Sequence, residues 1–213
     1  MPMMRCKRGL QKPVDKIRKN KVLIVEGVDE CNFFEVLLNH MSITDVEIHD
    51  MGGIKQFNKN MPALISARGF DNVHTIGIVR DAETSHQGAF SSVCSCMSKL
   101  GYSVPTSVET FTSGNPKIGI FITPGNLSNG MLEDLCLSTV SDHPIMQDVD
   151  KFLHKVMTKL DPCPNNSSKA KNQIFLSAMP EIVCNAGLGA KKGYWDFDSS
   201  TLNDLKTFLE NLR

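Results

Sequence analysis

The feature that most constrains the fold is an apolar run that ends on a carboxylate and a glycine, Val22-Leu23-Ile24-Val25-Glu26-Gly27. A short continuous apolar run rich in β-branched residues is typical of a parallel strand that is covered on both faces. Gly27 lets the chain turn, and the apolar residues of 31–40 then recur at helical spacing. The pattern predicts a strand, a tight turn and a helix. In open α/β sheets ligands bind beyond the carboxyl ends of the strands, which is where Glu26 falls.

A second apolar run ends in the same way. Residues 73–80 lead into Asp81-Ala82-Glu83, two carboxylates separated by one residue. If the two strands are neighbours, Glu26, Asp81 and Glu83 converge on one pocket, where their like charges repel unless a hard cation joins them. The sequence therefore predicts a site for Mg²⁺ or Mn²⁺ at this edge of the sheet.

The segments between these runs complete an alternating order of strands and helices. Residues 46–48 predict a short strand, and the glycine turn of residues 51–57 leads into a helix that continues to Ala67. This order predicts an α/β fold with a central, mostly parallel sheet of the Rossmann-like type.

The two acidic motifs resemble those of the TOPRIM domain, which occurs in type IA and type II topoisomerases, bacterial primases, small nucleases and overcoming-lysogenization-defect nucleases. The resemblance covers roughly residues 20–140 and rests on Glu26-Gly27 and on Asp81-x-Glu83. The family pattern has Asp-x-Asp where this chain has Asp-x-Glu, so the charge is kept on an arm that is longer by one methylene. Glu30 resembles a further acid of the lysogenization-defect nucleases, whose motif begins Val-Glu-Gly-x-x-Glu.

The resemblance implies metal-dependent phosphodiester chemistry. Glu26 would be both a general acid or base and a metal ligand, and Asp81, Glu83 and Glu30 would be metal ligands. Glu133 and Asp134 would complete a second metal site. These last two acids are equally compatible with a helix start, because Ser128 and Asn129 precede them as caps and acids are favoured in a first helical turn.

Lys169 and Lys171 are candidates for the late lysine that lysogenization-defect nucleases place near their metals, where an ammonium group steadies the charge on the phosphate. Ser168 is expected to cap the helix 169–179 in which they stand. Three later segments, residues 123–126, 130–135 and 193–196, resemble a small group of TOPRIM-like bacterial proteins from which no activity is carried over.

The chain is expected to have three parts. Residues 1–20 are a basic arm, residues 21–140 the TOPRIM-like domain, and residues 141–213 a helical extension packed on the same body. Residues 1–21 carry eight lysines and arginines against one acid, Asp15, although the whole chain has a net charge of zero. Such an arm either binds phosphates or is a solvated terminal segment.

The cellular location is predicted from the lack of membrane-spanning and signal segments in the sequence and from its cysteine content. No apolar run reaches the about 20 residues that cross a bilayer, and the amino end lacks the apolar stretch of a signal peptide. Seven cysteines, an odd number scattered along the chain, do not form a disulfide framework and fit a reducing compartment. We expect a cytoplasmic protein without membrane partners.

The function that these features predict is a Mg²⁺-dependent nuclease acting on DNA or RNA. By the resemblance, a role in phage defence is expected. The resemblance also suggests an ATPase partner, which would be a separate subunit because the glycine-rich loop 185–193 lacks the spacing of a nucleotide-binding P-loop. A homo-oligomer is compatible with the sequence. Two alternatives stay open, a non-catalytic module that binds metal with nucleotide or nucleic acid in a larger complex, and a regulatory subunit with a vestigial site.

Overall fold

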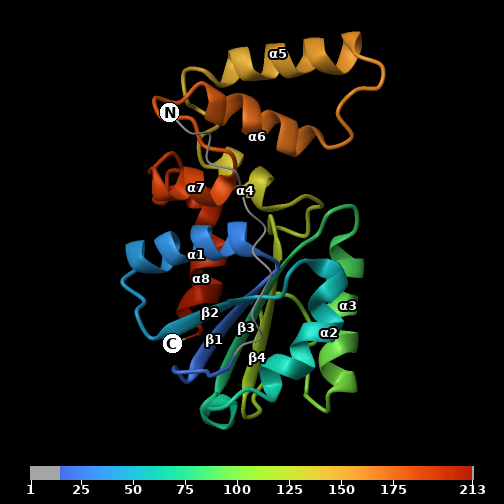
Figure 1. The fold of residues 1–213 in the computed structure, drawn as a ribbon, viewed down its shortest axis with the longest axis vertical. Coiled ribbons are helices and arrows are strands. Elements are labelled where there is room, and N and C mark those ends of the chain that lie inside the picture. Colours follow the sequence, from blue (N-terminus) through green and yellow to red (C-terminus); the bar gives the residue numbers. More distant parts are fainter. Residues whose placement is uncertain (1–14, 213) are drawn as a thin grey trace.

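The computed structural model describes residues 15–212 and has a four-stranded, all-parallel sheet with helices on both faces (Figure 1). The strand order is β2-β1-β3-β4, with β1 at Lys21–Val25, β2 at Val46–Asp50, β3 at Thr75–Asp81 and β4 at Lys117–Thr123. The predicted α/β class and the Rossmann-like parallel sheet are confirmed.

The order of the strands creates a topological switch point between β1 and β3. From β1 the chain first adds β2 on one side, and it then returns to place β3 on the other side of β1. The helices that follow β1 and β3 cover opposite faces of the sheet, which opens a crevice outside the carboxyl ends of the two strands. Glu26 and Asp81 lie there.

The helices form two layers that bury opposite faces of the sheet. One face is covered by α1 (Val28–His40), α4 (Leu132–Ser138), α7 (Ala186–Lys191) and α8 (Asn203–Glu210), and the other by α2 (Ile54–Ile65) and α3 (His86–Lys99). Side chains alternate between these layers, so that Leu23 and Val25 join the first core while Val22 and Ile24 join the second. Both faces are apolar for this reason.

Two helices stand apart from these layers. Helices α5 (Met146–Lys159) and α6 (Ser167–Ser177) form a hairpin beyond the carboxyl end of the sheet (Figure 1). The short 3₁₀ turns η1 (Phe70–Asn72) and η2 (Ser200–Leu202) precede β3 and α8. The expected extension after residue 140 therefore has two parts, since α7 packs on α1 and α8 on β4 while the hairpin projects.

Two predictions about local structure are wrong. The glycine-rich segment 185–193 is not a loop, because Ala186–Lys191 is helical and begins where the Asn185 side chain accepts a hydrogen bond from Leu188 N (2.9 Å). Helix α6 begins two residues earlier than expected, since Asn166 rather than Ser168 is its cap and accepts from Lys169 N (2.8 Å). In both cases an asparagine provides the oxygen that satisfies the first free N–H groups.

Most of the predicted basic arm lies outside the described residues, which begin at Asp15. In its described part, Ile17 is buried and its N–H donates to the Arg68 carbonyl oxygen (2.8 Å). The division at residues 20 and 140 stays a prediction.

Cys184 is disulfide-bonded, which departs from the expectation of reduced cysteines, while five other described cysteines are free. Within residues 15–212 no helix has the length and apolar character needed to cross a membrane.

Candidate functional site

Asp81 is the centre of the acidic site because β3 ends on it at the switch point. Its Oδ1 accepts hydrogen bonds from the Thr123 hydroxyl (2.5 Å) and from Leu132 N (3.0 Å), so β4 and the start of α4 both hold the carboxylate. Burial raises the pKa of Asp81 well above its ordinary value, the Thr123 hydrogen bond lowers it, and the charge of Glu26 raises it further.

Glu26 continues β1 and lies beside the backbone of β3. Its Oε1 accepts from Asp81 N (3.3 Å) and lies 3.6 Å from Nε of Arg80, a buried arginine whose Nε has no hydrogen-bond partner among the described residues. Burial raises the pKa of Glu26, the Arg80 guanidinium lowers it, and Glu83 raises it. The arginine partly compensates the charge of this carboxylate.

Asp29 and Glu30 stand in the first turn of α1, directly after the Gly27 turn. Asp29 Oδ1 accepts from Gly187 N (2.6 Å), which ties α1 to the first turn of α7. Burial raises the pKa of Glu30 to about 7, and the nearby charges of Asp29, Glu26 and Glu133 contribute to the rise. The protonation of Glu30 therefore changes near neutral pH.

The two acids of α4 have different surroundings. Glu133 faces the other carboxylates, and burial raises its pKa, which Lys169 lowers and Asp29 raises. Asp134 instead caps its own helix, because its Oδ2 accepts from Met131 N (2.9 Å). Asp134 thus lies in the first helical turn as the helix-start alternative predicts, although the N-cap is Met131 and not Ser128 or Asn129, and Glu133 lies with the predicted site residues.

Glu83 is exposed and lies at the edge of this group. Its backbone is in the left-handed region (φ 49°) and forms two hydrogen bonds with Gly130, Glu83 N to the Gly130 carbonyl (2.7 Å) and Gly130 N to the Glu83 carbonyl (3.0 Å). This pairing brings the loop after β3 to the start of α4. The charge of Glu83 raises the pKa of Glu26, so the two carboxylates interact.

The two predicted lysines are separated by the geometry of α6. Lys169 is exposed at the start of α6, and its charge lowers the pKa values of Glu26, Asp29 and Glu133, so it lies near the acidic group. Lys171 forms an ion pair with Asp150 of α5 (2.6 Å between Nζ and Oδ1). Only Lys169 is brought to the acids.

The carboxylates are coupled through their charges without forming a closed metal centre. Across residues 15–212, no three side chains of aspartate, glutamate, histidine or cysteine are close enough together to hold a metal ion. The donors are nevertheless carboxylate oxygens, the ligands that Mg²⁺ and Mn²⁺ prefer. Their chemistry fits a hard cation, and their present distances do not enclose one.

Comparison with known proteins places the chain in a family. Residues 20–213 match the model of DUF3226, described as "Protein of unknown function (DUF3226)". The chain belongs to the DUF3226 family. No curated protein matches its sequence.

Two solved structures resemble this DUF3226 protein. The hypothetical protein PH0156 from Pyrococcus horikoshii OT3 is 16% identical with a TM-score of 0.50, and the match covers 92% of this chain and 99% of that one. The C-terminal region of the OLD protein from Xanthomonas campestris pv. campestris is 12% identical with a TM-score of 0.46, and the match covers 91% and 96%. At 16% identity the likeness to PH0156 concerns the fold.

Three residues of the DUF3226 site were missed by sequence reasoning. Asp29 could have been predicted from the sequence, since it precedes Glu30 in an expected first helical turn. Thr123 could also have been predicted, because it closes an apolar run at the same edge of the sheet as Asp81. Arg80 could not, because only the pairing of β1 with β3 shows that a side chain of one strand meets Glu26 of the other.

Proposed function

We propose that this DUF3226 protein is a Mg²⁺-dependent nuclease that hydrolyses phosphodiester bonds in DNA or RNA with a TOPRIM-like site. The observation that carries the proposal is the convergence of Glu26, Glu30, Asp81 and Glu133 from three separate segments at the switch point of a parallel sheet. Burial raises the pKa of each of these four carboxylates. A fold that gathers buried like charges at a ligand-binding edge is typical of a functional site.

The hydrogen bonds leave oxygens available for a cation. Both bonds to Asp81 end on Oδ1, and both described interactions of Glu26 end on Oε1. Among the described residues, none donates to the second oxygen of either carboxylate. Asp81, Glu26 and Glu30 would therefore hold Mg²⁺, with Glu133 and the exposed Glu83 as further ligands. Closing the group requires rotation of the glutamate side chains, which their length permits.

The protein's own groups perform the remaining tasks of phosphodiester hydrolysis. When held by these carboxylates, Mg²⁺ would supply a water molecule of lowered pKa and charge stabilisation for the departing oxygen. Thr123 holds Asp81 in place, and Glu26 accepts or donates the proton of the reaction. Lys169, already near Glu26 and Glu133, provides an ammonium group for an oxygen of the phosphate.

A second function is favoured by two observations. The described residues do not enclose a metal, and Glu83 stands exposed where the TOPRIM pattern has aspartate. Both features fit a non-catalytic module that binds metal with nucleotide or nucleic acid within a larger complex. The role in phage defence and the separate ATPase subunit stay predictions from the resemblance.

The proposal is tested by cleavage of labelled single- and double-stranded DNA and RNA with Mg²⁺ or Mn²⁺. We expect cleavage by the wild type, and a loss of at least about 100-fold in Asp81→Asn. Asp142→Asn, an exposed aspartate in the turn before the hairpin, is the matched control and should cleave normally.

Three results contradict the nuclease. Equal cleavage by Asp81→Asn would assign the activity to another site or to a contaminant. No cleavage under any condition, together with calorimetric Mg²⁺ binding that Asp81→Asn abolishes, would favour the binding module. Absence of both cleavage and binding would overturn both functions.

A further inference from the structure

The α5–α6 hairpin concentrates positive charge in a chain that is otherwise acidic beyond residue 21. Residues 146–177, which contain both helices, hold five lysines against three acids, Asp148, Asp150 and Asp161. The rest of the chain from residue 22 onward contains 10 lysines and arginines against 19 aspartates and glutamates. A separated basic element of this kind attracts polyanions that the body of the protein repels.

The lysines of α5 form one stripe on its outer side. Lys151, Lys155 and Lys159 follow one another at intervals of four residues, so they share a face of the helix, and all three are exposed. Met146 and Val149 are buried, on the side that packs toward α6. Lys151 pairs with Asp148 (3.2 Å), whereas in the described part of the chain no ion pair involves Lys155 or Lys159.

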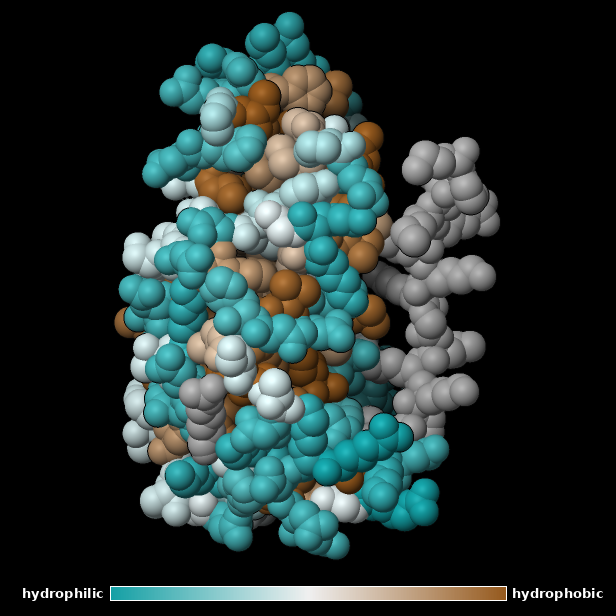
Figure 2. Space-filling view, turned by 90° about the vertical axis from the view of Figure 1, so that its left-hand side faces the viewer, coloured by the Kyte–Doolittle hydropathy of each residue, from teal (hydrophilic) through white to brown (hydrophobic). Residues whose placement is uncertain are grey.

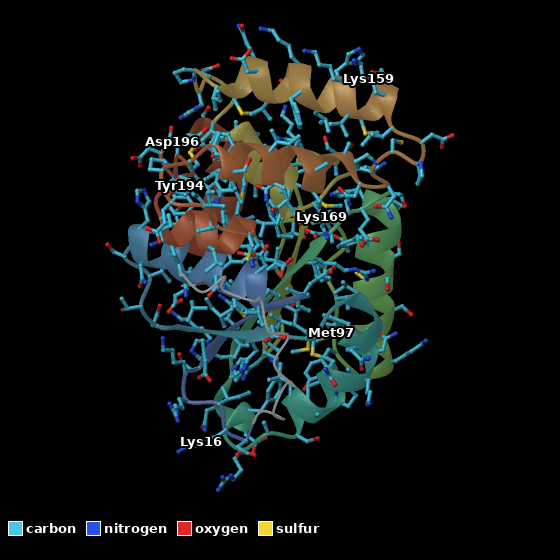
Figure 3. All side chains as sticks on the ribbon, turned by 45° about the horizontal axis from the view of Figure 1, so that its top comes forward. Lys16, Met97, Lys159, Lys169, Tyr194 and Asp196 are labelled. Carbon is cyan, nitrogen blue, oxygen red and sulfur yellow. The ribbon has the colours of Figure 1, made fainter. Side chains whose placement is uncertain are left out.

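The stripe ends where the hairpin approaches the acidic site. Lys159 closes α5 and Lys169 opens α6, so both belong to the same end of the hairpin (Figure 3). The Lys171–Asp150 pair fixes α6 to α5, and Asn166 Nδ2 donates to the sulfur of Met131 (3.5 Å) just before α4. This end of the hairpin therefore connects the lysine stripe of α5 with Lys169, whose charge acts on Glu26 and Glu133.

Apolar side chains are exposed beside these lysines. Phe152 is 54% exposed on α5, and Leu160, directly after the helix, is 56% exposed. Figure 2 shows brown and tan side chains among hydrophilic ones in the upper part of the molecule, where the hairpin stands. An exposed aromatic ring next to lysines is the combination on which unpaired bases stack.

We propose that the outer face of the α5–α6 hairpin binds a single-stranded nucleic acid. Lys155 and Lys159 hold its phosphates, and the ring of Phe152 stacks on a base. The inference rests on the proposed function in assigning nucleic acid as the substrate that this surface presents to the acids. Binding to the hairpin itself requires neither metal nor cleavage.

The test is the binding of fluorescein-labelled oligothymidine, measured by anisotropy in EDTA at several salt concentrations. We expect the double variant Lys155→Ala/Lys159→Ala to bind about 10-fold more weakly and to lower the slope of log K against log salt by about 1.4, since each phosphate contact on a single strand contributes about 0.7. Alanine favours helix, so α5 should be retained, which circular dichroism checks.

The matched control is Lys59→Ala/Lys99→Ala, which removes two exposed lysines from α2 and α3. This variant should bind like the wild type. Equal losses in the two double variants, an unchanged affinity of the hairpin variant, or no binding by the wild type at low salt would each overturn the proposal. Absence of oligothymidine binding by the wild type would favour another protein as the partner of the hairpin.

Failure of this inference is distinguishable from failure of the proposed function. If Asp81→Asn binds oligothymidine normally and the wild type never cleaves with metal, the surface is supported and the nuclease is overturned. If the wild type cleaves single strands and Lys155→Ala/Lys159→Ala does so with the same KM, the nuclease is supported and the surface is overturned.

Discussion

The two ends of the parallel sheet differ in whether their charged side chains are paired with opposite charges. At the amino end, Lys21 pairs with Asp45 (2.6 Å), and Lys19 Nζ donates to the carbonyl oxygens of Thr44 (2.7 Å) and Val46 (2.9 Å). Glu47 accepts hydrogen bonds from two backbone N–H groups there. At the carboxyl end, by contrast, carboxylates gather beside one another. One end of the strands is built for stability, and the other retains repulsion that a cation would relieve.

The repulsion is maintained because hydrogen bonds from a neighbouring helix and a neighbouring strand hold the acids in place. Gly187 of α7 holds Asp29, and Thr123 of β4 holds Asp81. Natural active sites commonly lower stability in this manner. The comparison predicts that changes at the carboxyl end alter stability and metal binding together, whereas changes at the amino end alter stability alone.

The largest effect is expected from Gly187→Ala, which breaks the anchor of the carboxyl end. A Cβ at this position would overlap the Asp29 carbonyl oxygen and lie 2.6 Å from its Oδ1. Because α7 would have to move away from α1, we expect a loss of about 3 kcal/mol in the free energy of unfolding. Urea denaturation followed by the fluorescence of Trp195, the only tryptophan, measures it. In Gly114→Ala the nearest atom is 3.6 Å away, and a loss as large there would contradict the close packing of α7.

A pH dependence is expected next, from Glu30. Its pKa is about 7 in the folded protein and 4.5 ordinarily, so the folded state binds the proton more tightly than the unfolded state. The resulting stabilisation is complete below the ordinary pKa and is lost as the pH rises through 7. In EDTA, we expect the free energy of unfolding to fall by about 2 kcal/mol between about pH 5 and about pH 8.

The variant Glu30→Gln should reduce this fall, to which the raised pKa values of Asp81 and Glu26 also contribute, and Mg²⁺ should reduce it in the wild type. Urea titrations across the pH range provide the measurement, with Glu35→Gln, an exposed glutamate of the same helix, as the control. A wild type whose stability is flat over this range would mean that burial and the neighbouring acids do not raise the pKa of Glu30 in the folded protein.

A smaller effect is expected from Thr123→Val, which keeps the buried volume and removes the hydroxyl that donates to Asp81. We expect a loss of about 1 kcal/mol and a Mg²⁺ affinity about 10-fold lower by calorimetry. Thr75→Val makes the same change at the amino end of β3, where Thr75 is also buried. Equally weak Mg²⁺ binding by Thr123→Val and Thr75→Val would contradict the prediction that only the carboxyl end of the sheet affects metal binding.

The smallest effect is expected from Asp45→Asn at the amino end. The Asp45 side chain is 51% exposed, so removal of its charge should cost about 0.5 kcal/mol, and less at high salt. Thermal denaturation at two salt concentrations detects it. Cleavage and Mg²⁺ binding should not change, and a clear decrease in either would show that the two ends are coupled.

Sequence reasoning located β1, β2 and β3 and the acids that follow β1 and β3, because an apolar run and its polar end are local features of the chain, but it did not predict β4. It did not distinguish between neighbouring residues of one type. Lys169 and Lys171 differ by two positions on α6, a turn of about 200° around the helix axis, so one lies near the acids and the other pairs with α5. The glycines of residues 185–193 were interpreted as a loop, because glycine that permits close helix packing looks the same in a sequence as glycine that permits a turn.

The sequence by itself determined that carboxylates end β1 and β3, since burial of consecutive apolar residues requires the polar ones to lie beyond the strand. Only the tertiary structure decided which acids meet. The placement of Asp29, Glu30 and Glu133 beside Asp81 depends on how closely α1, α4 and α7 approach, and that approach is set by contacts such as Gly187 against Asp29, between residues far apart in the chain.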